Sequence, residues 1–161
     1  MASSETAAAP RTATDAPPET TLRLVRVFDA PREAVFAAWT VPEHLVQWWG
    51  PESFTVPEHK IEVREGGGWW TRMRSPDGVD HVVSGTFREI RAPERLVMTW
   101  GWETDGVRGH ETLITLDLRD LGGRTELTLT QETFESAESC TGHGEGWKSS
   151  FVSLDQHLAK D

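Results

Sequence analysis

The sequence has no tyrosine, a single cysteine and no long apolar run. The lone thiol, Cys140, excludes an internal disulfide framework and is compatible with a reducing compartment. No stretch comes near the ~18 consecutive apolar residues that a membrane-spanning helix needs. The missing tyrosine removes one common catalytic acid. Disulfide-rich secreted scaffolds and helical membrane proteins are therefore not the expected classes.

Positive charge is also scarce. The chain has 16 Lys and Arg residues against 26 Asp and Glu residues, which gives a net charge of −10, and its basic residues are scattered. An acidic chain without a basic stripe repels nucleic acids and anionic membranes. We therefore expect neither nucleic acid nor a membrane as a partner.

The first twenty residues lack the apolar core of a signal peptide. They are rich in Ala, Thr and Pro and carry one Arg, which is typical of a disordered segment. We therefore expect a disordered tail over residues 1–20 and a cytoplasmic location. The remainder, residues 21–160, has the size of a single domain.

Tryptophan is the residue in excess, with eight in 161 residues. Side chains of this bulk in a small domain must fill a core, line a cavity or form an interface. Trp48 and Trp49 are adjacent, so we expect one to pack and the other to form a rim or lid over a cavity. The sequence also allows a homodimer.

Apolar periodicity and turn signals divide the chain into elements. Residues 21–29 alternate as a first strand. A short helix follows Pro31, and a second begins at Pro42 and stops at Gly50. Short Gly- and Pro-containing turns then cut the next region into strands that pair antiparallel. These six strands are predicted at 54–63, 68–75, 79–90, 95–104, 107–119 and 124–134.

The C-terminal stretch changes to a helical period. Spacings of three and four form one stripe of an α-helix over residues 137–158, with Ser136 as its N-cap. The stripe comprises Cys140, His143, Trp147, Phe151, Leu154 and Leu158. Gly142, Gly144 and Gly146 each weaken this helix by about 1 kcal/mol relative to Ala. Such glycines indicate either a close backbone approach or a cavity mouth that opens locally.

The order of elements is strand, two short helices, six strands and a long helix. This order predicts an α+β helix-grip fold, in which a seven-stranded curved antiparallel sheet wraps around the long C-terminal helix. The two short helices after the first strand close one end. A curved sheet held off a helix by large side chains leaves a cavity, which is where small molecules usually bind.

Strand alternation directs several large side chains toward that cavity. Trp69, Trp100 and Trp102 point inward on this pattern, whereas Trp70 falls on the opposite face. A wall of this kind favours an apolar ligand held by stacking and by a few polar anchors. The candidate ligand-binding residues are Trp39, Trp48, Trp69, Met73, Met98, Trp100, Trp102, His110, Thr112, Ile114, Gln131, His143 and Trp147.

Histidines are the main candidates for chemistry. His143 lies on the apolar stripe of the last helix and could bond a ligand, act as a general base or serve a structural role. His81 and His110 lie on strands, and with Glu111 or Glu145 they could form an acid–base pair. If the protein is an enzyme, His143 and His110 are its candidate catalytic residues.

Other chemical motifs are incomplete. The His143-Gly144-Glu145 triplet matches the H-x-E of zinc deaminases, but the P-C-x-x-C partner is missing. One cysteine with scattered histidines does not make a zinc site. The glycine triplet at 66–68 lacks the Lys-Ser/Thr of a phosphate loop and is followed by a strand. We expect no metal and no cofactor.

Four segments, at 29–51, 66–78, 84–100 and 142–158, resemble the SRPBCC (START-like) superfamily. They contain the strings AW, WWGP, PERLVMTW and HGEGW. Within the superfamily the chain resembles the bacterial relatives of the heat-shock-protein-90 ATPase activator homologues, over roughly residues 21–160. The resemblance implies the helix-grip fold. Gln131, where many relatives have His, and Thr71, where many have an aromatic residue, alter the polarity expected inside the cavity.

The superfamily includes lipid carriers, polyketide cyclases and aromatases, plant hormone receptors, antibiotic self-resistance proteins and co-chaperone domains, which share a cavity and not a reaction. We predict binding of an apolar, aromatic or polycyclic small molecule, anchored by His143, Gln131 and His110. The first alternative is a cyclase or aromatase that uses the same cavity. The second is a module that stimulates a chaperone ATPase; it ranks last because such activators generally carry a second domain.

Overall fold

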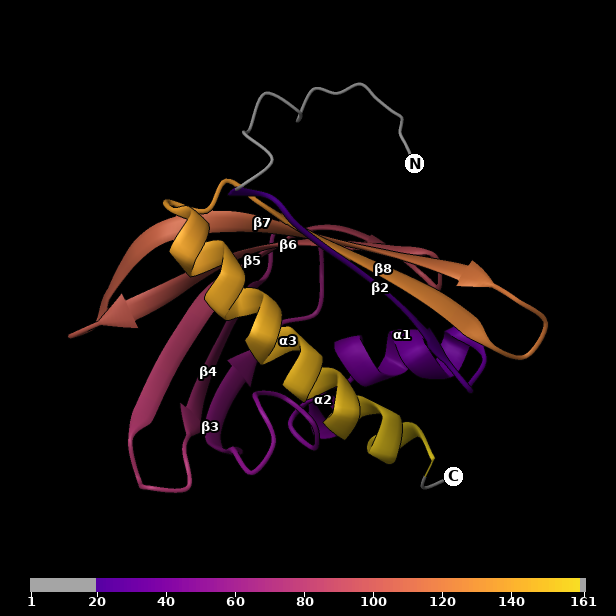
Figure 1. The fold of residues 1–161 in the computed structure, drawn as a ribbon, viewed down its shortest axis with the longest axis horizontal. Coiled ribbons are helices and arrows are strands. Elements are labelled where there is room, and N and C mark those ends of the chain that lie inside the picture. The colour runs from indigo at the N-terminus through magenta and orange to yellow at the C-terminus, as the bar shows by residue number, and fades with distance from the viewer. Residues whose placement is uncertain (1–19, 160–161) are drawn as a thin grey trace.

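The computed structural model of the protein describes residues 20–159 (Figure 1). All but the last residue of the predicted tail over 1–20 lies outside that range. The described elements follow in the predicted order. They are β2 (Leu22–Phe28), α1 (Arg32–Thr40), α2 (Pro42–Leu45), β3 (Thr55–Ile61), β4 (Gly68–Arg74), β5 (Asp80–Arg91), β6 (Arg95–Thr104), β7 (Val107–Asp120), β8 (Thr125–Glu132) and α3 (Ala137–Leu158).

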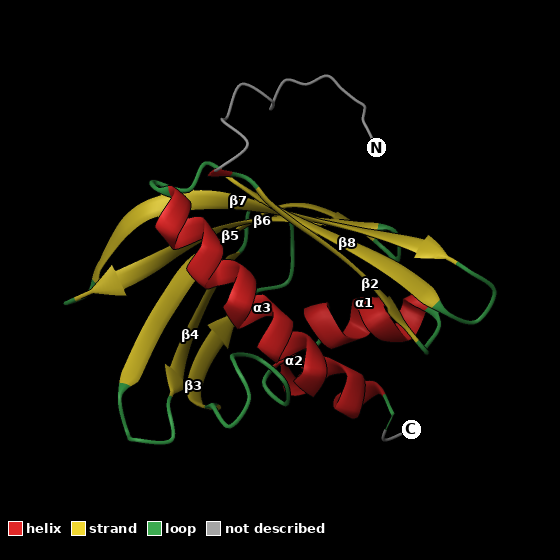
Figure 2. Cartoon of the chain, viewed as in Figure 1, coloured by secondary structure: helices red, strands yellow, loops and turns green. Residues whose placement is uncertain are grey.

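The strands form a seven-stranded antiparallel sheet in the order β2-β8-β7-β6-β5-β4-β3. From β3 to β8, each strand pairs with its neighbour in sequence, whereas β2 joins the edge beside β8. The sheet curves around α3, which crosses it diagonally, and α1 and α2 lie beside the C-terminal half of α3 (Figure 2). The predicted helix-grip fold is confirmed.

Strand β2 follows the alternation that predicted it. Leu22 and Leu24 are half-buried and Phe28 is fully buried on the side of the helix, while Val25 and Val27 are exposed on the other side. A strand with one buried face shows this two-residue period, because successive side chains point to opposite faces of the sheet. The inward residues therefore fix the register of β2 against β8.

Irregularities in three strand pairs bend the sheet. An extra residue on one strand disturbs the ladder and increases the local twist. The shifts in register lie between Thr55 and Glu58, between Phe87 and Glu89, and between Gly101 and Glu103. In β5, a Cβ atom at Gly85 would lie 2.0 Å from the Thr99 carbonyl oxygen. Only glycine allows this approach of β5 to the backbone of β6.

Helix α3 has the predicted bounds. Its N-cap is Ser136, whose hydroxyl accepts a hydrogen bond of 3.0 Å from the Ser139 amide, and this contact satisfies one of the free donors of the first turn. Trp147, Phe151 and Leu154 are buried against the sheet. The helical stripe of the sequence is thus the face that α3 turns to the sheet.

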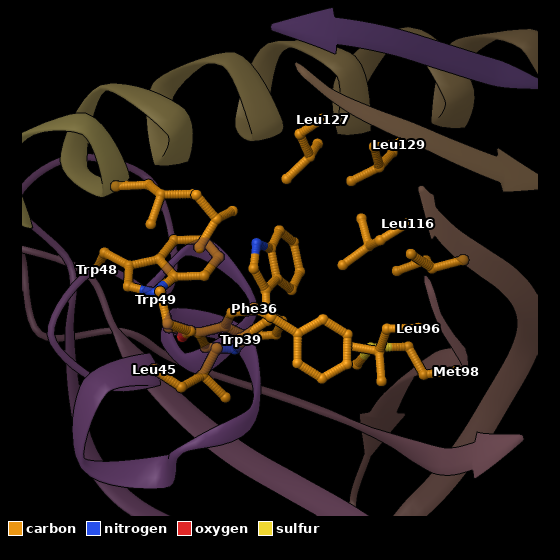
Figure 3. Close-up of a cluster of buried hydrophobic side chains, with 14 of the residues drawn as sticks. Phe36, Trp39, Leu45, Trp48, Trp49, Leu96, Met98, Leu116, Leu127 and Leu129 are labelled. Atoms are coloured by element: carbon orange, nitrogen blue, oxygen red, sulfur yellow. The ribbon is translucent and has the colours of Figure 1, made fainter. Parts of the chain in front are cut away.

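A packed cluster fills the space beneath the C-terminal half of α3. Trp39 from α1 lies against Trp48, with ring centroids 4.7 Å apart, and both are about 2% exposed. Figure 3 shows these rings between the short helices and the leucines of the sheet. The Trp48 indole N–H donates to the Ala38 carbonyl at 2.9 Å. Trp48 is therefore the packed member of the Trp48-Trp49 pair.

The outer face of the sheet carries charged side chains. Trp70 is half-buried there, with the Arg72 guanidinium 5.4 Å from its ring centroid, as the alternation of β4 predicts. Arg72 also approaches Glu58 and Asp80 at 3.6 and 3.8 Å. None of the described helices is long and apolar enough to cross a membrane.

Candidate functional site

A pocket of about 400 Å³ lies between the N-terminal half of α3 and the strands β4, β5 and β6. Its volume is within the range of small-molecule sites. The lining comes from the loop after α2, from these strands and from α3. The lining residues are Trp49, Gly50, Pro51, Phe54, Met73, His81, Trp100, Trp102, Ser139, Gly142, His143, Gly146, Trp147 and Ser150.

The periods of the two secondary structures explain this wall. On α3, positions 139, 142, 143, 146, 147 and 150 recur at three or four residues and lie on one face. On β6, Trp100 and Trp102 are two residues apart and share one face. Gly50 has a φ of 93°, a left-handed conformation that glycine adopts without strain. A Cβ there would lie 3.0 Å from the Met73 sulfur, inside the pocket wall.

Buried hydrogen bonds hold the ring of Trp147 against the pocket. Its indole N–H donates to Gln131 Oε1 at 2.8 Å, and the Gln131 amide donates to Thr112 Oγ1 at 2.8 Å. The Thr112 hydroxyl donates to the Trp100 carbonyl at 3.4 Å. Gln131 and Thr112 are buried and lie outside the pocket lining, so their role in these bonds is to position the ring.

Trp49 and Trp69 are fixed in the same manner. The Trp49 indole donates to Thr71 Oγ1 at 3.0 Å, and the Trp69 indole donates to the Thr99 carbonyl at 3.1 Å. Both rings are about 2% exposed. A threonine at position 71 is thus the hydrogen-bond partner of a pocket-lining indole.

Trp100 is the centre of the aromatic wall. Its ring centroid lies between 5.3 and 5.8 Å from those of Trp49, Trp69, Trp102 and Trp147. Such edge-on and tilted contacts are favourable for indole rings. The Trp100 indole N–H is buried and has no hydrogen-bond partner among the described residues. The indole N–H groups of Trp49 and Trp147, in contrast, each donate a hydrogen bond.

His143 forms the rim of the pocket together with Trp102. The Trp102 indole N–H donates to His143 Nε2 at 2.9 Å, and His143 Nδ1 lies 2.8 Å from the Ser139 carbonyl oxygen. An indole nitrogen only donates and a carbonyl only accepts. His143 is therefore neutral, with its proton on Nδ1. Burial holds the pKa of His143 below its ordinary value, against the opposing effects of the Ser139 carbonyl and the Glu135 charge.

Two of the helix glycines face empty space. A Cβ atom at Gly142 or Gly146 would meet nothing within 4 Å, and both residues line the pocket. At Gly144, a Cβ would lie 3.2 Å from Leu22 Cδ1. Close backbone approach therefore explains neither Gly142 nor Gly146. Local opening of the pocket at these residues stays a prediction.

Five of the thirteen predicted ligand-binding residues line the pocket: Met73, Trp100, Trp102, His143 and Trp147. The other eight do not. Seven of these are buried in the core or in the hydrogen-bond network, namely Trp39, Trp48, Trp69, Met98, Thr112, Ile114 and Gln131. The eighth, His110, is exposed, and its Nε2 contacts the Thr133 carbonyl. A ligand role for His110 would need a site outside this pocket.

Sequence reasoning missed most of the lining that comes from loops. Trp49, Pro51 and Phe54 lie after α2, where no periodicity reveals which way a side chain points. Trp49 was expected as a packed or rim residue, and it is both buried and pocket-lining. His81 lies on β5 at the pocket, but a lone strand histidine carries no signal for this position.

The two glutamates considered as partners for an acid–base pair both contact basic side chains. Glu111 is paired with Arg108 at 3.0 Å, and Glu145 with Lys148 at 3.6 Å. Neither glutamate is among the described residues that line the pocket, and His81 and His143 are its only ionisable side chains there. No group of three or more His, Cys, Asp or Glu residues within 20–159 could hold a metal ion.

Comparison with known proteins identifies relatives over nearly the whole described chain. The family model for activator of Hsp90 ATPase homolog 1-like protein matches residues 29–159. The crystal structure of the AHSA1 protein from Silicibacter pomeroyi is similar, with 33% identity and a TM-score of 0.79, over 86% of this chain and 97% of that chain.

Two further solved structures share the fold at lower identity. A protein from Arthrobacter aurescens is 29% identical, with a TM-score of 0.78, over 89% of this chain and 88% of its own. A protein from Chromobacterium violaceum is 27% identical, with a TM-score of 0.78, over 88% of this chain and 99% of its own. No curated protein matches the chain.

Proposed function

The chain belongs to the family of activator of Hsp90 ATPase homolog 1-like proteins, in the SRPBCC superfamily, and we propose that it binds an apolar aromatic small molecule in the pocket beneath α3. The fold of this family is generally a ligand-binding fold. Fold alone does not identify a ligand. The case for binding therefore rests on the pocket's own residues.

The observation that carries the proposal is the pair of glycines in the pocket wall. Gly142 and Gly146 weaken α3 by about 1 kcal/mol each relative to Ala, yet an alanine Cβ would meet nothing at either position. A helix that needed only to pack would be more stable with alanine there. Their effect on the described structure is to keep the volume of the pocket open, as a binding site requires.

The character of the wall supports an aromatic ligand. Trp49, Trp100, Trp102 and Trp147 all line the pocket, and indole rings offer large apolar surfaces with preferred edge-on and stacked geometries. The polar side chains are few: the two histidines and the hydroxyls of Ser139 and Ser150. Pockets with mostly apolar walls and a few polar groups are typical of small-molecule sites.

A direct test is binding of naphthalene, followed by the change in tryptophan emission, together with native mass spectrometry of gently purified protein to detect a retained molecule. We expect saturable binding. Gly146→Leu should weaken it by about tenfold or more, because over-filling a site costs about 1–3 kcal/mol. Thr141→Leu, exposed on the same helix and outside the lining, is the matched control. Equal affinity in both variants would place binding elsewhere.

A catalytic role for His143 gains no support from the pocket. Both of its ring nitrogens are hydrogen-bonded, whereas a general base needs a free lone pair directed at its substrate. No carboxylate stands among the described lining residues to assist it. His110, the other candidate, is outside the lining.

A further inference from the structure

The rim of the pocket contains an acceptor that is already occupied. His143 Nε2 carries a lone pair, because its partner, the Trp102 indole, can only donate. The Nδ1 proton is held by the Ser139 carbonyl, and this bond fixes both the tautomer and the ring orientation. The pocket rim therefore has a hydrogen-bond acceptor in a fixed position, and the Trp102 indole N–H donates to it.

Trp102 is the least buried of the four tryptophans that line the pocket. It is 36% exposed, whereas the neighbouring Trp100 is 6% exposed. It also lies where the register of β6 and β7 shifts, between Gly101 and Glu103. A side chain with little burial on an irregular strand loses few contacts when it moves. His143, in contrast, is held by the helix that carries it.

The charges around His143 disfavour an anionic ligand. The described lining contains no Lys or Arg, and the nearby charged group is Glu135, which is negative. His81, the other ionisable residue of the lining, faces Trp102 with ring centroids 6.4 Å apart. A carboxylate would meet the lone pair of Nε2 with no cation to compensate it, which is costly in a buried site.

We propose that the ligand is a neutral aromatic molecule with a hydrogen-bond donor on its ring, such as a phenol, which displaces the Trp102 indole from His143 Nε2. This inference rests on the proposed function and names the chemical class of the ligand. The Trp102 indole is itself an aromatic ring with a donor, and its N–H bonds the same atom, His143 Nε2, that the donor of the ligand would bond. Binding exchanges one donor for another, so the acceptor stays satisfied throughout.

The experiment compares three probes with the same ring system at pH 7.5: 2-naphthol, which donates, 2-methoxynaphthalene, which only accepts, and 2-naphthoate, which is anionic. We expect 2-naphthol to bind about tenfold more tightly than either of the others, because a phenolic O–H is a stronger donor to Nε2 than an indole N–H and the released Trp102 N–H can bond water at the exposed rim. Equal affinities, or tighter binding of 2-naphthoate, would overturn the inference and leave the proposed function intact. If no probe binds, the proposed function itself fails.

Two substitutions test the residues separately. His143→Phe keeps an aromatic ring but removes the acceptor, so the preference for 2-naphthol over 2-methoxynaphthalene should disappear. Trp102→Phe keeps a ring but removes the competing N–H, so the ratio of 2-naphthol affinity to 2-methoxynaphthalene affinity should rise several-fold, whatever the smaller ring does to both probes. Trp102→Phe is on the half-exposed rim and tests the exchange even if His143→Phe fails to fold. An unchanged or lower ratio of the two affinities in Trp102→Phe would contradict the exchange.

Discussion

The space between the sheet and α3 is solid under the C-terminal half of the helix and open under its N-terminal half. In the packed half, Phe151 and Leu154 are about 2% exposed or less and fill the volume against Phe28 and the leucines of β7 and β8. In the open half, the side of the same helix that lines the pocket carries Gly142 and Gly146. One helix thus serves as a core element at one end and as a pocket wall at the other.

The difference lies in side-chain volume and not in backbone architecture. Both halves use the same antiparallel sheet and the same helical period. An unfilled cavity lowers the stability of a core. The same cavity can serve as a binding site when the side chains that line it are held in place. Here the rings of Trp49 and Trp147 keep that shape because buried hydrogen bonds hold them.

The largest expected contrast is between two phenylalanines. Phe151→Ala should lower the free energy of unfolding by about 3–5 kcal/mol, because Phe151 is fully packed. Phe54→Ala should lower it by about 1 kcal/mol, because Phe54 is half-buried at the pocket and leaves no closed cavity. Urea titrations of the two variants measure both values. Equal losses would mean that the two halves are packed alike.

Two tryptophans at the boundary sharpen the comparison. Trp147→Phe removes the donor to Gln131 and leaves a buried amide oxygen without its partner, so we expect a loss of about 1–3 kcal/mol beyond the change in ring size. Trp100→Phe removes an N–H that has no partner among the described residues, so this contribution should be absent. Denaturant titrations of the two variants measure the difference between their free energies of unfolding, provided that the dependence on denaturant concentration has the same slope in both. A larger loss for Trp100→Phe would contradict the assignment.

Replacing the glycines of α3 by alanine should change the free energy of unfolding by less, and should raise it. Gly146→Ala should stabilise the protein by about 1 kcal/mol through helix propensity, because the new methyl group meets nothing within 4 Å. Gly144→Ala should gain less, since its Cβ would lie 3.2 Å from Leu22 Cδ1. Thermal melts compare the two variants. Destabilisation by Gly146→Ala would show that close packing, and not pocket volume, explains this glycine.

The smallest effect concerns pH. Burial holds the pKa of His143 below its ordinary value of about 6.5. Its contribution to the free energy of unfolding is therefore present above pH ~6.5 and is lost as the pH falls through the depressed pKa of the folded state. Stability should decrease between pH 7.5 and 5 by more in the native protein than in His143→Gln. Identical pH profiles would mean that His143 titrates alike in both states.

The fold was predictable because its signals are local. The alternation in β2, the stripe of α3 and the Ser136 N-cap all depend on neighbouring residues, and each is as predicted. Trp100, Trp102 and Trp147 were likewise identified as inward-facing, and they line the pocket.

The rest of the site depends on curvature, which no local pattern contains. Alternation shows that Trp69 and Met98 point inward from the sheet. It does not show that they lie behind the residues that line the pocket. His110 shares the parity of Thr112 in the sequence, but the register shift beside Gly101 breaks that parity, and His110 ends in contact with the Thr133 carbonyl. Gln131 does point inward, and its hydrogen bonds to protein side chains occupy it.

The position of β2 in the sheet has a consequence for the order in which the chain folds. From β3 to β8 each strand pairs with its neighbour in sequence and can add to the sheet through a short loop, but Leu22 must find Gln131 across most of the chain. Closing so long a loop is entropically costly and slow. We therefore expect β2 to dock last, after the open half has formed, and pulsed hydrogen-exchange labelling during refolding would detect late protection of its amides. Because β2 precedes β8 in the chain, its pairing partner becomes available only after β8 has left the ribosome, and β2 stays unpaired with it until then.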